Sequence, residues 1–488
     1  MSRYPAYPEY KPTGCDWFPE IPSHWGIDRA KWSVTSCQNG VWGAEPNGDD
    51  DLVCIRVADF DRQSLRVSTE KLTMRSIAEK DRRNRLLEAG DLLLEKSGGG
   101  ENQLVGAVVE FNQPFPAVSS NFIARMVASD EMNSRFLAYL HSHLYSGRVN
   151  FRSIKQTTGI QNLDSQAYLD EQIAYPPLAE QEAIARFLDF KTAQIDALIA
   201  KKKFLLDKLA EKRTALISHA VTRGLDSSVP MKDSGVAWLG KIPEHWQRML
   251  MVRIIFKFEQ GWSPSCDERE ASLDEWGVLK SGCVNHGIFR EHEHKTLPPS
   301  IEPIPSLEVK VGDILMCRAS GSRHLIGSVA MVRKCRSKLI FSDKTYRISL
   351  QPDTIDPEFF VLLMKSKYLR EQIELSISGA DGLANNIPQS SVKGYQIILP
   401  PTINEQKAIS TWLNEKIESI EAQEVKIFEV IERLQEYRAA LITNTVTGKT
   451  DVRGFEIPPP AEGMASEAVP NGVESTGVLQ LSEVLSEY

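Results

Sequence analysis

The chain carries one long segment twice. The stretch PPLAEQEAIARFL, which begins at Pro176, returns as PPTINEQKAISTWL at Pro400, and the two copies end in the similar sequences ALISHAVT and ALITNTVT. With Glu180 aligned on Glu405, the copies match at polar and apolar positions alike. Between these glutamates and the copies' ends there is neither Gly nor Pro, which is typical of a long α-helix. The repeat therefore predicts two equivalent helices and should be interpreted before any other feature.

Apolar residues in the predicted helices, 176–224 and 400–448, recur every seven positions, which is the a/d pattern of a coiled coil. A second row, three residues further on, is predicted at Leu198 and Leu205 in the first helix and at Val430 and Tyr437 in the second. A helix of about 43 residues would be about 60 Å long. The first row comprises Leu188, Ile195, Leu209 and Leu216, with Lys202 as the exception, and Leu413, Ile420, Ile427, Leu434 and Leu441.

A shorter repeat precedes each helix. DWFPEIPSHW, which ends at Trp25, matches AWLGKIPEHW, which ends at Trp246, and the regions between share GDLLLEKSGGGENQLVGAVV and GDILMCRASGSRHLIGSVA. Each of these echoes predicts a strand, a Gly/Ser loop and a further strand. The predicted fold class is therefore α/β (α+β): two small mixed domains, 1–175 and 225–399, separated by two long antiparallel helices in a pseudo-twofold repeat.

The formal net charge of −8 is concentrated at one end of the chain. Residues 451–488 hold seven acidic side chains and one basic one, so the rest of the chain is close to neutral and can still present a basic groove. Because this end is rich in Pro, Ala, Gly and Glu, with little to bury, a disordered tail is predicted over 449–488.

Composition predicts a cytoplasmic protein. No run approaches the 18 or so apolar residues of a membrane span, and the first residues have neither the basic nor the apolar region of a signal peptide. Seven cysteines, odd in number and nowhere spaced as CxxC, favour reduced thiols over disulfides or structural zinc.

The IPxHW segment, the variable region and the PP-x-EQ helix, each present twice, resemble the specificity subunit of type I restriction-modification systems. The resemblance covers nearly the whole chain except the acidic tail. It implies that each variable region is a target recognition domain that reads one half of a split, asymmetric site in double-stranded DNA. It also implies that the helices space the two domains and dock two adenine methyltransferase (modification) subunits, and that restriction (helicase-nuclease) subunits join the complex.

The same resemblance implies no catalysis and no cofactor in this chain. S-adenosylmethionine would belong to the partner methyltransferase, and ATP and Mg to the partner restriction subunit. Within the chain, none of the proline pairs has the Asn/Asp-Pro-Pro-aromatic form that an amino-methyltransferase needs. TGKT at 447–450 lacks the first Gly of a phosphate-binding loop, since Thr443 stands there, and favours a helix end capped by Gly448.

Other histidines and cysteines favour structural roles. Zinc-ligand types gather at Cys283, His286, His292 and His294, but without a partner pair at finger-like spacing, so a solvated loop is favoured. His24 and His245, inside the IPxHW segments, are expected to hydrogen-bond locally. Two other classes stay open: a coiled-coil adaptor that joins two non-DNA binding domains, and a nuclease or methyltransferase with degenerate motifs.

The candidate DNA contacts lie in four segments of the variable regions. Gly-rich loops expose backbone N–H groups that can cradle phosphate, Lys and Arg neutralise it, and side-chain amides can pair with adenine. Each segment can also be a turn with solvated charge. The predicted residues are Lys96, Ser97, Gly98 and Gly99; Arg148, Arg152, Lys155 and Gln156; Arg318, Ser320 and Arg323; and Asn385, Asn386 and Gln389.

Overall fold

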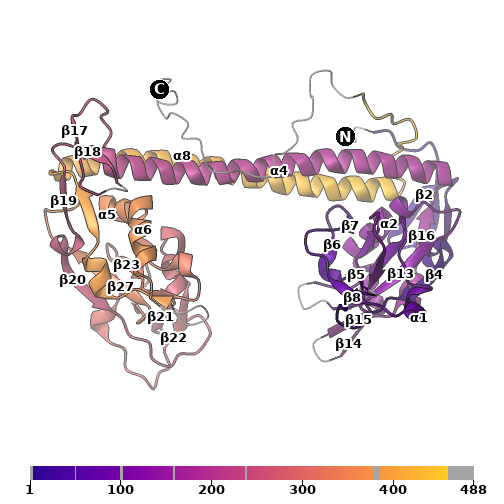
Figure 1. Cartoon of the computed structure of the whole chain (residues 1–488), viewed down its shortest axis with the longest axis horizontal. Helices are drawn as coiled ribbons and strands as arrows, with labels where there is room; N and C mark the ends of the chain where they lie inside the picture. The colour runs from indigo at the N-terminus through magenta and orange to yellow at the C-terminus, as the bar shows by residue number, and fades with distance from the viewer. Residues whose placement is uncertain are drawn as a thin grey trace. The chain divides into compact units, whose positions relative to one another are not determined.

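The computed structural model describes residues 4–49, 51–98, 103–157, 160–236, 239–378 and 385–459, without the side chains of residues 156 and 157. The chain divides into two compact units. Met1–Ala197 with Leu434–Tyr488 form one, which we name the N-terminal unit, and Leu198–Arg433 form the other, the central unit. Two long helices, α4 (Leu178–Arg223) and α8 (Ile403–Val446), contribute residues to both units (Figure 1).

The N-terminal unit is built on a six-stranded sheet. Its central strand β9 (Leu92–Glu95) is buried at every residue and pairs antiparallel with β11 and β13. The sheet order is β4 (Val34–Asn39), β13 (Ile123–Ala128), β9, β11 (Val108–Glu110), β7 (Arg66–Val67) and β6 (Phe60–Asp61). A three-stranded sheet, β12 (Ala117–Ser119), β5 (Asp51–Ile55) and β8 (Met74–Ser76), completes the domain with helices α1 (Glu79–Arg82), α2 (Ser134–Ser146) and α3 (Ser165–Leu169).

The central unit repeats this plan with fewer strands. Its four-stranded sheet has the order β20 (Ile255–Gln260), β27 (Thr345–Leu350), β23 (Ile314–Cys317) and β25 (Val329–Met331). Strand β21 (Gly277–Leu279) pairs antiparallel with β22 (His294–Thr296) and parallel with β26 (Leu339–Ile340), as β5 does with β8 and β12. The helices are α5 (Pro357–Met364), α6 (Lys367–Ser376) and α7 (Gln389–Lys393). The predicted pair of mixed α/β domains is confirmed.

Short strand pairs frame each half in the same way. The hairpin β1 (Tyr10–Cys15) and β2 (Phe18–Pro22) corresponds to β17 (Met231–Asp233) and β18 (Lys241–Pro243). Strand β3 (Gly26–Arg29) pairs with β16 (Gln172–Tyr175), and β19 (Gln247–Leu250) pairs with β29 (Gln396–Leu399). Strands β16 and β29 lead directly into α4 and α8. In each half, the last strand before the long helix thus pairs with a strand from the start of that half.

The long helices run antiparallel within each unit. In the N-terminal unit Arg438 of α8 pairs with Asp196 of α4, with Nε and Oδ1 3.0 Å apart. In the central unit Arg213 of α4 pairs with Glu424 of α8. The helices have 46 and 44 residues, which at 1.5 Å per residue is about 69 and about 66 Å. Two predicted features, the paired helices and their opposite directions, are confirmed.

The seam between the helices differs from the prediction in its second row. The first row is correct: its members are buried or half-buried, and Ile195 and Ile420 are 5% and 3% exposed. Leu198 and Leu205, however, are 48% and 41% exposed, whereas Ile199 is 3% exposed. Coiled-coil positions alternate steps of three and four residues, so one row alone leaves two choices for the next. Here the step is four. Val430 and Tyr437 are exposed. The second row consists of buried or half-buried side chains: Ile199, Leu206 and Arg213 on α4, and Ile431 and Arg438 on α8.

The segment after α8 is packed further than the predicted start of the tail. Gly448 ends the helix at φ +73°, as expected for a C-cap, and Asp451 N donates to Pro5 O at 2.9 Å. Val452 is 1% exposed, and the Phe455 ring lies 4.9 Å from the ring of Phe187 on α4. The predicted start of the tail at 449 is therefore too early, since the chain is packed as far as Phe455; the acidic composition of the whole segment concealed two apolar side chains that pack. Residues 460–488 lie outside the described part.

Candidate nucleic-acid interface

A small sheet in the N-terminal unit joins two of the predicted DNA-contact segments. Its strand order is β10 (Ser97–Gly98), β15 (Ile160–Leu163) and β14 (Ile154–Thr157). Ser97 lies opposite Asn162, and its Oγ donates to Asn162 Oδ1 at 2.6 Å. The Gly/Ser loop and the basic stretch, separated in sequence by about fifty residues, therefore share one sheet.

The predicted cations of this sheet are held by exchangeable surface contacts. Lys96 Nζ donates to Asn39 Oδ1 at 2.7 Å, and the exposed Arg148 lies over the ring of Phe151. Arg152 lies over the Trp17 ring and faces Asp16 at 3.5 Å. Lys155 pairs with Asp164 at 2.9 Å, and this bond lowers the pKa of that carboxyl. Exposed pairs of this kind are weak, so the cations can turn to phosphate. Gly99 and the side chain of Gln156 lie outside the described residues.

The central unit contains the counterpart of this sheet. Strand β24 (Ala319–Ser320) pairs antiparallel with β28 (Asn385–Asn386), with Ser320 opposite Asn385. Arg318 donates to Asp343 O at 3.2 Å and Arg323 to Glu374 O at 3.2 Å, while Gln389 begins helix α7. Again two segments that are distant in sequence meet at one small sheet.

The comparison of the two sheets adds two residues that the prediction missed. Gln161 and Asn162 occupy β15 as Asn385 and Asn386 occupy β28. Both amide pairs begin 15 residues before the Pro-Pro pair of the following helix, so counting back from Pro176 would have found them. Gln161 is 5% exposed and its Oε1 accepts from Val105 N at 3.2 Å, whereas Asn162 is exposed. Asn162 is therefore the member of its pair that can meet a ligand.

A buried ion pair supports the loop of the N-terminal unit. Glu95, directly before Lys96, is 1% exposed and accepts from Arg62 Nη2 at 2.7 Å. Burial raises the pKa of Glu95 and Arg62 opposes the rise. Arg62 also donates to Tyr145 Oη at 3.0 Å, and Tyr145 donates to Leu104 O at 2.8 Å. The loop is thus fixed at both of its ends.

The glutamate of the PP-x-EQ motif explains why the IPxHW segment is repeated. In the N-terminal unit the Glu180 carboxylate accepts from Trp25 Nε1 at 2.9 Å and from Tyr7 Oη at 2.6 Å, and contacts His24 Nε2 at 2.8 Å. Burial and the bond to Glu180 raise the pKa of Tyr7. In the central unit Glu405 accepts from Trp246 Nε1 at 2.8 Å, with His245 Nε2 at 3.1 Å. Both histidines are hydrogen-bonded, as expected, but to a glutamate of the following long helix, not to a residue nearby in the sequence.

The glutamine of the motif attaches the recognition domain to the helix. Gln181 Oε1 accepts from Asn133 N at 2.9 Å, directly before helix α2. Gln406 Oε1 accepts from Asp356 N at 2.8 Å, directly before helix α5. Asn133 and Asp356 are the N-caps of these helices, so each Gln holds the start of one helix on the start of another. Adjacent residues of one motif thereby fix two parts of the same half.

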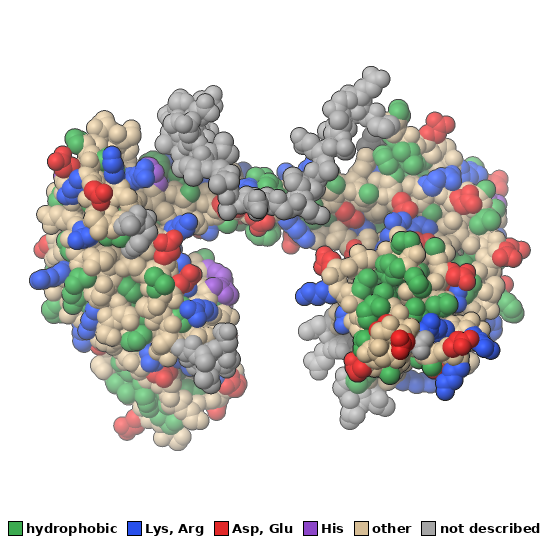
Figure 2. Space-filling model, in the orientation of Figure 1, with side chains coloured by type: hydrophobic (Ala, Val, Ile, Leu, Met, Phe, Trp, Pro, Cys, Tyr) green, Lys and Arg blue, Asp and Glu red, His purple; other side chains and the backbone are tan. Residues whose placement is uncertain are grey.

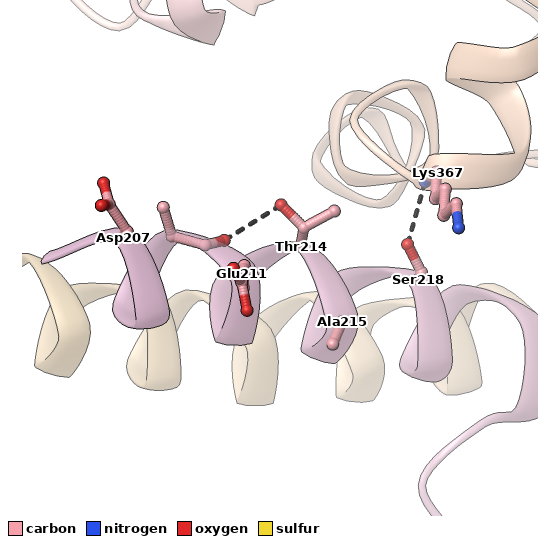
Figure 3. Close-up of a pocket in the computed structure, with 7 residues that line it drawn as sticks. Asp207, Glu211, Thr214, Ala215, Ser218 and Lys367 are labelled. Carbon is pink, nitrogen blue, oxygen red and sulfur yellow. Dashed lines mark hydrogen bonds between the residues drawn. The ribbon is translucent and has the colours of Figure 1, made fainter. Parts of the chain in front are cut away.

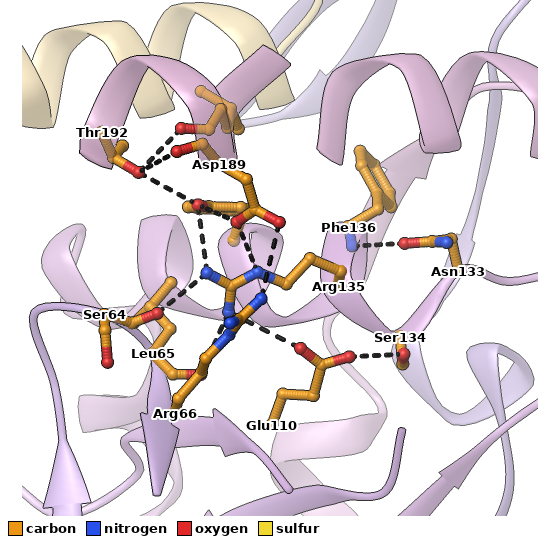
Figure 4. Close-up of polar contacts among 12 residues, drawn as sticks. Ser64, Leu65, Arg66, Glu110, Asn133, Ser134, Arg135, Phe136, Asp189 and Thr192 are labelled. Carbon is orange, nitrogen blue, oxygen red and sulfur yellow. Dashed lines mark hydrogen bonds and ion pairs between the residues drawn. The ribbon is translucent and has the colours of Figure 1, made fainter. Parts of the chain in front are cut away.

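A polar network adds a further attachment in the N-terminal unit. Arg135 of α2 donates through Nε to Asp189 of α4 at 2.7 Å, and Tyr139 Oη donates to the same carboxylate at 2.7 Å (Figure 4). Burial raises the pKa of Tyr139 to about 12. Glu110 lies 3.7 Å from Arg135 and accepts from Ser134 Oγ. Because Arg135 and Glu110 are paired and largely buried, removal of either one would be costly.

The long helices carry exposed apolar side chains within the central unit. Phe204 is 61% exposed and Phe428 is 57% exposed, and hydrophobic side chains are visible on the surface of the helices in Figure 2. A groove of about 570 Å³ runs along α4 beside α6, where Lys367 N donates to Ser218 Oγ at 2.9 Å (Figure 3). Small side chains, Ala210, Thr214 and Ala215, line its floor. Contiguous exposed apolar patches are typical of surfaces that contact a protein partner, a membrane or a ligand.

No metal or membrane site is found among the described residues. They contain no group of three or more Cys, His, Asp or Glu that could hold a metal ion, and no helix apolar enough to cross a membrane. His294 is buried, with Nε2 accepting from Ala271 N at 3.0 Å, while His286 and His292 are exposed. The seven cysteines form no disulfide.

Comparison with known proteins identifies the family. Residues 68–206 match the family model of the type I restriction modification DNA specificity domain. The specificity subunit of type I restriction enzyme EcoEI of Escherichia coli is 35% identical over 208 residues, which are 42% of this chain and only about a third (34%) of that protein's length. The EcoKI specificity subunit of Escherichia coli strain K12 is 23% identical over 368 residues, 74% of each chain.

The fold comparison agrees. A chain from a solved structure on complex assembly and conformational transition of the type I restriction-modification system superposes with a TM-score of 0.60 at 14% identity. The superposition covers 87% of this chain and 98% of that one. The resemblance seen in the sequence is confirmed: residues 68–206 match the type I restriction modification DNA specificity domain, and the chain is similar to specificity subunits of type I restriction-modification systems over most of its length.

Proposed function

We propose that each half of the chain reads one part of a split, asymmetric site in double-stranded DNA. The long helices hold the two recognition domains at a fixed spacing and dock two adenine modification subunits, to which restriction subunits attach. S-adenosylmethionine is then bound by the modification subunits, and ATP and Mg by the restriction subunits.

The observation that carries this proposal is the equivalence of the two small sheets. Both halves pair a Gly/Ser segment with a strand that carries two adjacent side-chain amides, Gln161 and Asn162 in one half and Asn385 and Asn386 in the other. Asn and Gln amides can make two hydrogen bonds to adenine in the major groove, and neighbouring Lys and Arg can contact phosphate. Two equivalent surfaces on one chain support the reading of two half-sites.

The docking of modification subunits is supported by the exposed apolar side chains of the helices. Leu198, Phe204, Leu205, Val425 and Phe428 are between 41% and 61% exposed, although they lie on helices that already bury a complete seam. A neutral body binds phosphate weakly by itself, because phosphate neutralisation dominates affinity for DNA. We therefore expect tight DNA binding only when modification subunits are present.

Exchange of one variable region tests the proposal. Residues 25–175 or 246–399 are replaced by the corresponding region of a related specificity subunit, and the methylated sites are sequenced. One half of the methylated sequence should change while the other half stays the same. If both halves change in a complex that still assembles, the halves do not read DNA independently. A chain that acts only as an adaptor would produce no sequence-specific methylation with its modification subunits.

A further inference from the structure

A turn of the chain fills the space between the recognition domain and the helices in the N-terminal unit. It joins β6 to β7, and Gln63 Nε2 at its tip donates to Asp196 Oδ1 at 2.6 Å. Arg438 of α8 donates to both Asp196 Oδ1 and Gln63 O. The turn thus satisfies one charged side chain from each long helix.

Arg135 holds the same turn from the side of the recognition domain. Its guanidinium donates to Ser64 O at 2.9 Å and to Leu65 O at 3.2 Å (Figure 4). The turn therefore contributes three main-chain carbonyls, which accept from Arg135 and Arg438, and the Gln63 amide, which donates to Asp196. The contacts define what a polypeptide must offer to occupy it.

The central unit has an open pocket of about 420 Å³ at the corresponding place. The half-repeat relates its walls to those of the filled site: Glu358 of α5 and Glu421 of α8 stand where Arg135 and Asp196 stand in the other half. The connection that would fill it is shorter. It has 14 residues, 280–293 between β21 and β22, against 18 residues, 56–73 between β5 and β8.

Two charged side chains that line the pocket, and Arg213 close to it, have hydrogen-bonding capacity that no described residue uses. Arg213, the counterpart of Arg438, bonds to Glu424, but its buried Nε is left without a hydrogen bond. Glu421 and Lys365 line the pocket, are exposed to solvent, and make no ion pair with any described residue. Desolvation lowers the pKa of Lys365, with Glu421 opposing and Arg213 adding to the shift. A ligand that supplies acceptors to the cations and a donor to Glu421 would satisfy them.

The remaining wall of the pocket is more apolar than its counterpart. Met331 takes the place of Glu110, Leu362 that of Tyr139, and Ile417 that of Thr192. Phe289 at the tip of the short connection faces the same space. These side chains can pack against an apolar group of a ligand, whereas the polar side chains at the equivalent place in the N-terminal unit do not favour one.

We propose that the pocket receives a polypeptide turn of the modification subunit that docks on the central unit. The turn carries one large apolar side chain against Met331, Leu362 and Ile417, a basic or amide side chain for Glu421, and main-chain carbonyls for Lys365 and Arg213. This inference rests on the proposed function. It assigns the two modification subunits different contacts, because the equivalent place in the other half is already occupied by residues 62–65.

Charge reversal in the pocket tests the inference. The full-length double variant Lys365→Glu with Glu421→Arg is mixed with the modification subunit, and the complexes are counted by native mass spectrometry. One of the two modification subunits should bind about tenfold more weakly while the other keeps its affinity. The matched control is Glu302→Lys, an exposed acid of the same unit outside the pocket, which should bind two subunits normally. Equal binding of two subunits by the double variant would overturn the inference alone.

A crosslink gives a second measurement that does not depend on the fold of the double variant. Photo-reactive benzoyl-phenylalanine at Phe289 should crosslink to one peptide of the modification subunit, whereas the same group at Phe256, which is 69% exposed and outside the pocket, should not. A crosslink to residues 460–488 of this chain would show that its own tail is the occupant and overturn the inference. If the unaltered chain binds no modification subunit at all, the proposed function falls, and this inference with it.

Discussion

Lengthening both long helices by one heptad should lengthen the unread spacer of the DNA site. The insertion points must lie opposite each other, and the ion pairs Asp196–Arg438 and Arg213–Glu424 fix that alignment. Halfway between them, the position after Leu206 on α4 faces the position after Val430 on α8. Seven residues add about 10 Å of helix at 1.5 Å per residue. At about 3.4 Å per base pair this corresponds to up to about three base pairs.

The half-sites themselves should not change, because no residue of either small sheet moves relative to its own domain. Sequencing of the sites methylated by the complex gives both the spacer and the half-sites. Insertion of two residues is the control: it rotates the seam by about 200° at 3.6 residues per turn and should abolish assembly. A heptad variant that methylates efficiently with an unchanged spacer would refute the idea that these helices set the distance.

Three further results are expected. Asn162→Ala and Asn386→Ala should each weaken base discrimination by about 1–3 kcal/mol in one half-site only, as measured by methylome sequencing, and an effect on both halves would contradict separate reading. Glu180→Ala should lower the free energy of unfolding by about 2–4 kcal/mol in urea titrations, because it leaves the buried Trp25 and Tyr7 donors without an acceptor. Glu405→Ala should cost less, about 1–2 kcal/mol, since Glu405 is 30% exposed and lacks a tyrosine partner in the described residues; equal losses would show that the burial of Glu180 and its bond to Tyr7 add nothing. Removal of residues 460–488 should leave assembly and methylated sequence unaltered, whereas removal of everything after Arg453 also deletes Phe455 and should destabilise the chain by about 1–2 kcal/mol. Loss of assembly in the shorter truncation would identify those 29 residues as an interaction element.

The helices could be predicted because their signal is local. A heptad repeat, the absence of Gly and Pro, and a duplicated motif all act within one continuous segment. The second row of the seam could not be predicted from such local signals. Whether Leu198 or Ile199 faces the partner depends on the side chains of the other helix, which lie more than two hundred residues away in the sequence.

The candidate interface shows a similar limit. Composition points to four segments, and the structure joins them two by two: through β15 between β10 and β14 in one half, and through the pairing of β24 with β28 in the other. Gln161 and Asn162 lie just beyond the predicted basic stretch, which ends at Gly159, and only the comparison of their distance from the Pro-Pro pair with that of Asn385 and Asn386 marks them. Which strands pair across dozens of residues depends on the rest of the sheet, so it cannot be predicted from the composition of a single segment.

The PP-x-EQ motif has a consequence for how such a gene changes. Glu and Gln, side by side, bind the segment that enters a recognition domain and the helix inside it, as Glu180 does with Trp25 and Gln181 with Asn133. A recombination event with one crossover near IPxHW and another near PP-x-EQ would therefore deliver a complete domain with both of its anchoring points. The residues between the crossovers are then free to diverge wherever they do not meet the long helices, whereas contacts such as that of Arg135 with Asp189 have to be kept or replaced.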